Sequence, residues 1–457
     1  MTTATHTPAA TEASGWAGHP PGLFTLFFTE MWERFSYYGM RAFLILYMTA
    51  PAAAGGLGFA DADAASVYGT YTGSVWAAAI VGGIVADRFL GQYRSVLVGG
   101  IVIALGHFTL AFEALPFFYT GLALIVAGTG LLKPNVSTLV GSLYAPGDPR
   151  RDAGFSLFYM GINLGAFIGP LIAGYLAQRV SWHMGFAAAG VGMTFGLVQY
   201  VLGKKRLQPA LDRLAVEPKP AAAGSVAERP TQPPGQASPA GFTSAEWKRI
   251  AAVVVLFLFA SLFWGAYEQA GSTLNLFADR HTRLEIAGFE FPSSWFQSVQ
   301  PIFVILLAPA FAWLWLRLGP HEPSSPAKFA LGLFFMGLAF LVLVPAGAAV
   351  DGSTGFRVSP WWLVAAYFVS ELGELCLSPV GLSLVTKLSP ARIVGLMMGV
   401  WFLSNALGNK LAGWAAGFIT TLPLATLFGT VAGVTLFSAL VLFTIVRPIR
   451  RLMGGVR

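Results

Sequence analysis

Long apolar runs alternate with short polar segments along the whole chain, and this pattern predicts its architecture. About a dozen runs hold about twenty residues or more, enough for a helix to cross a hydrocarbon core roughly 30 Å thick, whereas a barrel strand needs only about ten. We therefore predict membrane-spanning helices at residues 23–48, 65–86, 95–112, 117–143, 154–177, 184–202, 250–278, 295–316, 329–349, 361–386, 394–419 and 424–446.

These predicted helices fall into two groups of six, separated by a polar segment. Residues 203–244 contain seven prolines and begin with a basic cluster, a composition typical of a disordered linker that has room for one short amphipathic helix. We expect an N-terminal tail at 1–22, a six-helix bundle at 23–203, a proline-rich linker at 204–244, a second six-helix bundle at 245–448 and a C-terminal tail at 449–457.

The composition agrees with an all-α polytopic membrane protein. Of 457 residues, 55% are hydrophobic and 11% are charged, whereas a soluble chain is about 25% charged. Too little sequence remains outside the predicted helices for a soluble catalytic or DNA-binding domain. The single cysteine, Cys376, excludes an intrachain disulfide and a cysteine metal cluster. We expect no metal, no cofactor and no enzymatic activity.

The basic residues predict the orientation of the chain in the membrane. If residue 1 lies inside, the loops and tails on that side carry twenty Lys and Arg residues, and the opposite side carries four, at Arg179, Arg280, Arg283 and Arg357. The positive-inside rule then places both termini in the cytoplasm. The net charge of +7 is explained by this asymmetry, so we expect no nucleic-acid partner.

Nine charged residues fall inside the predicted helices. Each costs roughly 2.5–3.5 kcal/mol at the bilayer centre, so such residues usually pair or face an aqueous cavity. On the first helix, an angular stripe about 100° wide holds five polar groups that form one inward face. The stripe consists of Glu30, Glu33, Arg34, Tyr37 and Arg41; the other intramembrane charges are Lys133, Glu268, Glu371, Glu374 and Lys410.

Six short segments resemble signatures of one transporter family. Residues 30–39, EMWERFSYYG, resemble the ExxERFxYYG signature of the proton-dependent oligopeptide transporter family, and residues 158–165, FYMGINLG, resemble its FYxxINxG signature. Further similarities lie at 130–135 (GLLKPN), 264–269 (WGAYEQ), 373–379 (GELCLSP) and 401–405 (WFLSN). The resemblance spans residues 22–446 and implies the major facilitator superfamily fold, with twelve transmembrane helices in two six-helix bundles.

The resemblance also implies a function and a set of substrate-binding residues. A bacterial inner-membrane symporter would import di- and tripeptides with protons, as a monomer in contact with membrane lipids. Arg41 and Lys133 would hold the peptide carboxylate, and Glu374, with Asn163 and Gln300, would hold the amino terminus. The remaining binding residues would be Tyr37, Tyr38, Trp76, Trp264, Glu268, Trp401 and Ser404.

Coupling to an ion gradient is expected because the chain has no phosphate-binding loop for ATP. Glu30, Glu33 and Glu268 are the candidate proton carriers, with Arg34 and Lys133 as the basic groups that stabilise their charged forms. Formation and separation of such pairs would couple protonation to the shape of the cavity.

A further motif predicts a gating element. Residues 83–91, GIVADRFLG, resemble the GxxxDRxxG motif of the superfamily. Gly83 and Gly91 would let helices meet closely, and Asp87 with Arg88 would form a charged clasp on the cytoplasmic side.

Three positions depart from the family pattern. Gly69 stands where animal members have a histidine, so coupling should rest on carboxylates. Trp76 replaces a binding-site tyrosine, and Gln300 replaces an asparagine of the eighth helix. We expect His107 to be a hydrogen-bonded structural residue, and the sequence leaves open whether Lys410 pairs with Glu371 or reaches the membrane interface.

Two other functions remain open at this stage. Relatives with this fold carry nitrate or other small anions, and a peptide sensor or channel would not accumulate substrate. Glu374 and Asn163 favour a peptide over an anion, and the two six-helix groups favour a transporter.

Overall fold

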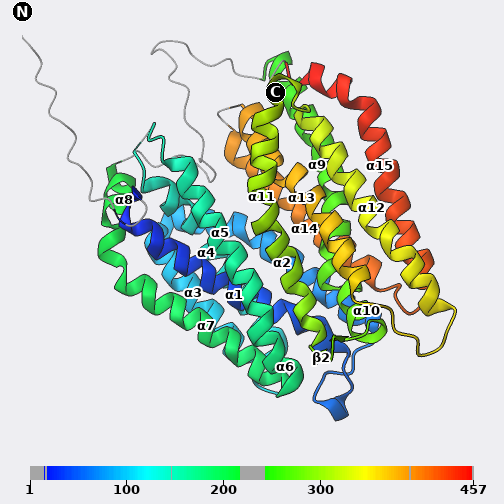
Figure 1. The fold of residues 1–457 in the computed structure, drawn as a ribbon. Helices are drawn as coiled ribbons and strands as arrows, with labels where there is room; N and C mark the ends of the chain where they lie inside the picture. The colour runs from blue at the N-terminus through cyan, green and yellow to red at the C-terminus, as the bar shows by residue number, and fades with distance from the viewer. Residues whose placement is uncertain (1–14, 16–17, 146, 217–241, 391–392, 455–457) are drawn as a thin grey trace, which may run out of the picture.

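A computed structural model describes residues 15, 18–145, 147–216, 242–390 and 393–454. Most of the expected linker, residues 217–241, lies outside the described residues. The described chain is almost entirely helical, and its single two-stranded sheet pairs β1 (Glu285–Ile286) with β2 (Phe289–Glu290) in antiparallel fashion. Figure 1 shows two bundles side by side, the N-terminal one in blue to green and the C-terminal one in green to red.

The first bundle contains the six predicted spans. Its helices are α1 (Pro21–Thr49), α2 (Asp61–Val85), α3 (Gln92–Leu110), α4 (Leu115–Ser142), α5 (Arg151–Gly169) with α6 (Tyr175–Arg179), and α7 (Trp182–Leu202). The fifth span is continuous through a π-helical turn at Pro170–Gly174. Pro170 has no N–H for the regular ladder, which explains why the helix widens there.

The second bundle contains the other six spans. Its helices are α9 (Ser244–Tyr267) with α10 (Thr273–His281), α11 (Val299–Leu318), α12 (Ser325–Asp351), α13 (Trp361–Leu388), α14 (Val394–Ala416) and α15 (Leu424–Leu452). Among the described residues, ten helical segments are long and apolar enough to cross a membrane. The helices α1 and α14 occupy the places of the predicted first and eleventh spans, and the twelve-helix fold is confirmed.

Two predicted helices differ from the structure in their regularity. The seventh span is not one helix, because a 3₁₀ turn at Glu268–Gly271 separates α9 from α10. The eighth span begins with a 3₁₀ turn at Ser293–Ser298 before α11 starts. Both irregular turns are short, as 3₁₀ segments usually are, and the first carries a predicted site residue, Glu268.

A short amphipathic helix, α8 (Lys204–Val216), follows the first bundle directly. Its Leu207 and Ala210 are fully buried in a core with residues of α1 and α4, including Leu23 and Leu139. Its other charged residues are exposed, whereas Arg213 is half-buried and donates a 3.0 Å hydrogen bond to the backbone oxygen of Ser142. The first part of the predicted linker is therefore packed onto the first bundle, at the end where α1 begins (Figure 1).

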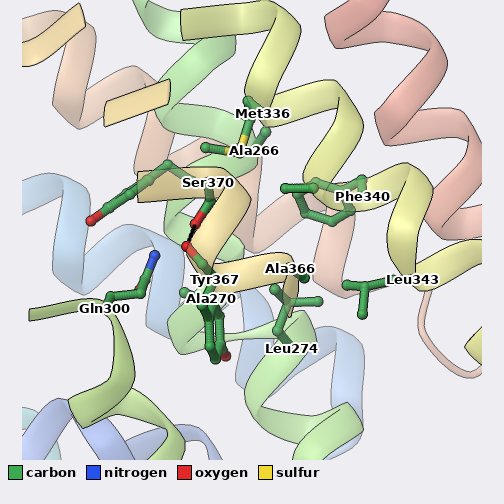
Figure 2. Close-up of a pocket in the computed structure, with 12 residues that line it drawn as sticks. Ala266, Ala270, Leu274, Gln300, Met336, Phe340, Leu343, Ala366, Tyr367 and Ser370 are labelled. Carbon is green, nitrogen blue, oxygen red and sulfur yellow. Dashed lines mark hydrogen bonds between the residues drawn. The ribbon is translucent and has the colours of Figure 1, made fainter. Parts of the chain in front are cut away.

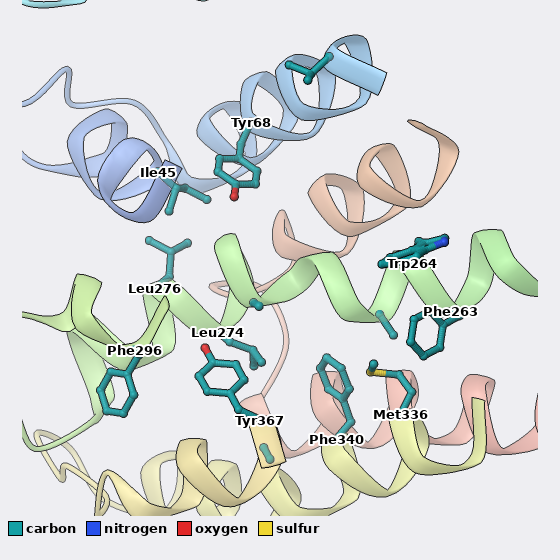
Figure 3. Packing of buried hydrophobic residues seen from close by; sticks show 14 of the residues in the cluster. Ile45, Tyr68, Phe263, Trp264, Leu274, Leu276, Phe296, Met336, Phe340 and Tyr367 are labelled. Carbon is teal, nitrogen blue, oxygen red and sulfur yellow. The ribbon is translucent and has the colours of Figure 1, made fainter. Parts of the chain in front are cut away.

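The largest apolar core crosses the boundary between the bundles. Figure 3 shows Ile45 of the first bundle facing Leu276 of the second, with Tyr68 directed at the same helix and Leu274 on its other side near Tyr367. The two bundles therefore share buried apolar surface, which favours their association.

Hydrogen bonds also join the bundles, and they gather at the end opposite α8. Three side chains of the second bundle donate to backbone carbonyls of the first: Asn275 to Ala42 at 2.8 Å, Trp295 to Leu171 at 3.1 Å and Ser298 to Phe167 at 2.7 Å. Arg280 adds a two-pronged contact with Asp61, at 2.6 and 2.7 Å. At this end the bundles are held by directional contacts as well as by packing.

Glycines set the distance between α1 and α5. A Cβ atom added to Gly165 would lie 2.1 Å from the backbone oxygen of Met31, and one added to Gly169 would lie 2.5 Å from that of Phe35. Close approach of this kind is typical of small residues at helix contacts in membranes. It explains on structural grounds why the 158–165 motif ends in glycine.

Substitution of Gly165 by alanine should therefore destabilise the protein. The added methyl group would force α1 and α5 apart, and overpacking of this kind typically costs about 1–3 kcal/mol. Thermal unfolding of the purified protein would measure the loss. Gly433→Ala is the matched control, because no atom lies within 4 Å of its added Cβ, and equal unfolding temperatures for the two variants would contradict the prediction.

Candidate functional site

A group of buried charges lies on the inward face of α1. Arg34 forms a two-pronged ion pair with Glu33, in which Nη2 donates to Oε1 at 2.6 Å and Nε donates to Oε2. Glu30, one helical turn before Arg34, lies 3.4 Å from the same guanidinium. All three side chains are at most 2% exposed, so one base serves two acids where Coulomb interactions are strong.

Arg41 connects the two bundles. Its guanidinium forms a buried ion pair with Glu268 and donates a 2.5 Å hydrogen bond from Nε to the hydroxyl of Tyr68. Glu268 occupies the 3₁₀ turn that interrupts the seventh span. The helix break and the ion pair together place a carboxylate of the second bundle against a base of the first.

Aromatic rings surround these guanidinium groups. Arg34 lies 5.1 Å from the ring centroid of Tyr37 and 5.7 Å from that of Tyr38, and Arg41 lies 5.8 Å from the ring of Tyr38. A cation within about 6 Å of a ring face is attracted by its quadrupole. The two tyrosines of the first-helix motif therefore line the charged groups.

Lys133 lies on α4 and contacts Trp76 of α2. Its ammonium is 3.9 Å from the centroid of the indole ring, and that ring stacks on Phe402 of α14. Lys133 also interacts electrostatically with Glu30 and Glu33. The tryptophan that departs from the family pattern thus holds the lysine by a cation–π contact at the boundary between the bundles.

The second bundle contributes an acid, Glu374, that has no ion-pair partner among the described residues. Glu374 is 6% exposed, and its Oε2 has no hydrogen-bond partner among the described residues. Gln300 and Asn163 are also buried, and Asn163 donates to the backbone oxygen of Tyr159 at 3.0 Å. The three residues predicted to hold an amino terminus come from α13, α11 and α5.

Figure 2 shows a small cavity in this part of the second bundle. Gln300 and Ser370 lie on one side of it and Met336, Phe340 and Leu343 on the other, with Tyr367 and Ala270 among the other lining residues. The cavity joins a polar wall, which includes predicted site residue Gln300, to an apolar wall formed by α12.

The remaining predicted binding residues have packing contacts of their own. Trp264 and Trp401 are buried; the ring of Trp264 packs on Tyr267, and that of Trp401 packs on Phe329. Ser404 donates to the backbone oxygen of Trp401 at 2.6 Å. Its hydroxyl is fully buried and satisfied within its own helix.

The predicted gating motif lies where α2 passes into α3. Gly83 is buried near the end of α2, Asp87 falls in a π-helical turn at Ala86–Leu90, and Arg88 is exposed. Asp87 accepts a 3.2 Å hydrogen bond from Gln92. Gly91 has a φ of +72°, a conformation that glycine adopts without strain.

The sequence reasoning missed Tyr68 as a site residue. Its hydroxyl bonds Arg41, and its ring lies 5.7 Å from the Arg41 guanidinium. Tyr68 and the predicted Trp76 are eight residues apart on α2, a spacing that places both on one helix face. That periodicity could have identified it.

The packing around Gly69, which follows Tyr68, explains why position 69 holds no histidine. An added Cβ would lie 2.9 Å from the backbone oxygen of Asn409 and 2.9 Å from the Cα of Gly413. The helices α2 and α14 therefore meet too closely at this position for any side chain.

The structure shows the surroundings of two further residues, Lys410 and His107. Lys410 is exposed on α14 and donates to the hydroxyl of Thr70 at 2.6 Å, so it does not pair with Glu371. His107 is fully buried, but neither ring nitrogen has a hydrogen-bond partner among the described residues. The expectation that His107 is hydrogen-bonded was therefore wrong for the described part of the chain.

Comparisons with known proteins give a consistent result. The model of the POT family, PTR2, matches residues 93–210 and 242–433. The uncharacterized transporter YclF of Bacillus subtilis (strain 168) is 43% identical, with 97% of this chain and 96% of the relative covered. Peptide transporter YePEPT of Yersinia enterocolitica is 39% identical, with 100% and 99% covered.

A solved structure extends the similarity to three dimensions. A mutant of peptide transporter POT, crystallised in complex with alafosfalin, is 40% identical and superposes with a TM-score of 0.84 over 98% of each chain. The relatives are transporters and not enzymes. With its twelve-helix architecture, its charged first-helix motif and these full-length similarities, the chain is an integral membrane protein that belongs to the POT family of transporters.

Proposed function

We propose that the protein is a proton-coupled symporter that imports di- and tripeptides by alternating access, as a monomer in the bacterial inner membrane with both termini in the cytoplasm. The observation that carries the proposal is the buried Arg41–Glu268 ion pair between the bundles. A charge pair across the bundle boundary can respond both to a substrate carboxylate and to a proton. The names of the relatives YePEPT and POT support a peptide as the substrate.

The site offers opposite charges for the two ends of a peptide. Arg41 and Lys133 supply positive charge for the carboxylate, the first as a directional fork and the second as a point charge. Glu374, with Asn163 and Gln300, supplies the acceptors for the ammonium group. Because the site binds the two charged termini and requires no charge between them, it suits a substrate whose side chains vary.

The aromatic residues supply the permissive part of the site. Tyr37, Tyr38, Trp76, Trp264 and Trp401 offer apolar faces with polar edges, which accept side chains of different size. Ser404 supports Trp401 through the hydrogen bond to its backbone oxygen.

Coupling follows from competition for Arg41. A peptide carboxylate that binds Arg41 displaces Glu268, and a buried carboxylate without its base is stabilised by taking up a proton. Glu30 and Glu33 share Arg34, so one of them can also accept a proton while the other keeps the ion pair. Binding of a peptide and a proton would then favour the same rearrangement of the bundles.

The motif at 83–91 is proposed as part of the gate on the side of the termini. Gly91, with its positive φ, allows the turn from α2 into α3, but no atom lies within 4 Å of its added Cβ, so it does not bring two helices close together. Gly83 is buried on α2, and Asp87 with Arg88 would form the charged clasp. The motif would act on conformation rather than on the substrate.

Uptake driven by an imposed gradient tests the proposal. In proteoliposomes that are acidic outside, labelled dialanine should accumulate above its external concentration, and a protonophore should abolish the accumulation. Equilibration without accumulation would indicate a channel or sensor. Counterflow by nitrate but not by dialanine would indicate an anion transporter, and either result would overturn the proposal.

We also propose that the linker acts as a plain tether. Deletion of residues 221–240, which lie outside the described residues, should leave dialanine uptake within about twofold of the wild type, because loop closure depends only weakly on length. Initial uptake rates at equal protein density would measure this. A several-fold rise in rate or peptide affinity would mean instead that the linker restrains the transporter.

A further inference from the structure

The intramembrane charges are not balanced evenly between the bundles. Arg34 pairs with Glu30 and Glu33, and Arg41 pairs with Glu268. Lys133 contacts Trp76, and Lys410 faces outward with Thr70. Two acids of α13 remain, Glu371 and Glu374, and neither has an ion-pair partner among the described residues.

Glu371 is the more deeply buried of these two acids. Its side chain is 0% exposed, and neither carboxylate oxygen has a hydrogen-bond partner among the residues that the structure describes. It precedes Glu374 by three residues, which puts the two side chains on neighbouring positions of one helix face, about 5–6 Å apart at Cβ. The two carboxyl groups therefore belong to one pocket.

The groups that face Glu371 from other helices are uncharged. They are Tyr267 of α9, Gln300 of α11 and Tyr159 of α5. Gln300 and Tyr267 also line the small cavity of Figure 2, as does Ser370, the neighbour of Glu371 in the chain. Among the residues that the structure describes, the pocket thus offers hydrogen-bonding groups but no positive charge.

A buried carboxyl group without a base is costly as an anion, so it must hold a proton or receive a cation. The proposed function assigns the ammonium group of the peptide to Glu374. The side chain of a peptide's first residue branches from the carbon that bears this ammonium. A positive group on that side chain would therefore reach the neighbouring position on α13, which Glu371 occupies.

We propose that Glu371 is a subsite for the cationic side chain of a peptide's first residue, so that the transporter favours peptides that begin with lysine or arginine. This inference rests on the proposed function, and it adds a preference to it. Peptides with a neutral first residue leave Glu371 protonated and bind through their termini alone.

Competition with labelled dialanine uptake tests the inference. Lysyl-alanine and norleucyl-alanine are matched in length and differ in the terminal charge of the first side chain. In the wild type, lysyl-alanine should inhibit about tenfold more strongly than norleucyl-alanine. Alanyl-lysine, whose charge lies on the second residue, should show no comparable advantage over alanyl-norleucine.

Substitution assigns the preference to Glu371. In Glu371→Gln the advantage of lysyl-alanine over norleucyl-alanine should fall to near one. In Glu285→Gln, a change of an exposed acid on β1, the advantage should stay at its wild-type value. Glu374→Gln should weaken both peptides together, which separates the two acids.

Three results would overturn the inference. The first is a wild type without the preference, a measurement that does not depend on any variant folding. The second is a preference that survives Glu371→Gln in folded protein. The third is a Glu371→Gln variant in which the proton dependence of dialanine uptake changes while the preference does not, since Glu371 would then be a proton carrier. Failure to transport dialanine at all would refute the proposed function instead.

Discussion

Replacement of Glu33 by glutamine is expected to abolish concentrative dipeptide uptake driven by a proton gradient. Glutamine keeps the shape of the side chain but cannot ionise, so the two-pronged ion pair with Arg34 is lost. Arg34 would then depend on Glu30, which lies 3.4 Å away and would be held in its charged form. Neither acid could then exchange a proton during the cycle.

Peptide exchange separates this effect from a loss of binding. Counterflow of dialanine needs no net proton movement, and it is expected to persist in Glu33→Gln. The measurements are gradient-driven uptake and counterflow in the same proteoliposomes. Asp63→Asn, at an exposed acid of α2, serves as the control and should behave as the wild type. Full accumulation by Glu33→Gln would exclude Glu33 from proton coupling.

Arg41→Lys should lower the affinity for dipeptides tenfold or more. The Arg41 guanidinium contacts Glu268, the Tyr68 hydroxyl and the ring of Tyr38 at once. An ammonium group keeps the charge but has no planar fork, so it cannot reproduce a two-pronged carboxylate contact. The tenfold loss corresponds to about 1.4 kcal/mol of binding free energy.

Equilibrium binding of a dipeptide to purified protein would measure the effect. Arg357→Lys is a suitable control, because Arg357 is exposed in the segment before α13 and lies outside the proposed site. Unchanged affinity in an Arg41→Lys protein with a normal unfolding temperature would mean that Arg41 only holds the bundles together.

The sequence predicted most of the architecture because the bilayer imposes two simple rules on a membrane-spanning chain. An apolar run of sufficient length must become a helix, and a charged residue within that run must face inward. Both rules apply to α1, where the spacing of Glu30, Glu33, Arg34 and Arg41 predicted one inward face. The structure brings these residues together with Glu268 as charged partners.

The parts that could not be predicted depend on contacts between distant segments. The break at Glu268–Gly271 lies in an apolar run with no proline. The turn packs closely against another helix, because an added Cβ at Gly271 would meet the Tyr68 hydroxyl at 1.9 Å. Its partners are Tyr68 and Arg41 of the first bundle, and no local sequence pattern predicts these contacts.

The sequence also could not predict which side chains contact each other across the boundary between the bundles. Lys410 bonds Thr70, which is 340 positions away in the sequence. Trp76 holds Lys133 and stacks on Phe402. The sequence gives the residue types for such contacts, but the partner depends on how the two bundles are rotated against each other.

The hydrogen bonds at the end opposite α8 distribute constraint unequally between the bundles. Asn275, Trp295 and Ser298 donate from their side chains, whereas their acceptors are main-chain carbonyls of Ala42, Leu171 and Phe167. A carbonyl persists whatever side chain its residue carries. Sequence changes at positions 42, 167 and 171 therefore leave these three bonds available, whereas changes at 275, 295 and 298 remove them. The Arg280–Asp61 contact at the same end differs, because it needs a particular side chain from each bundle.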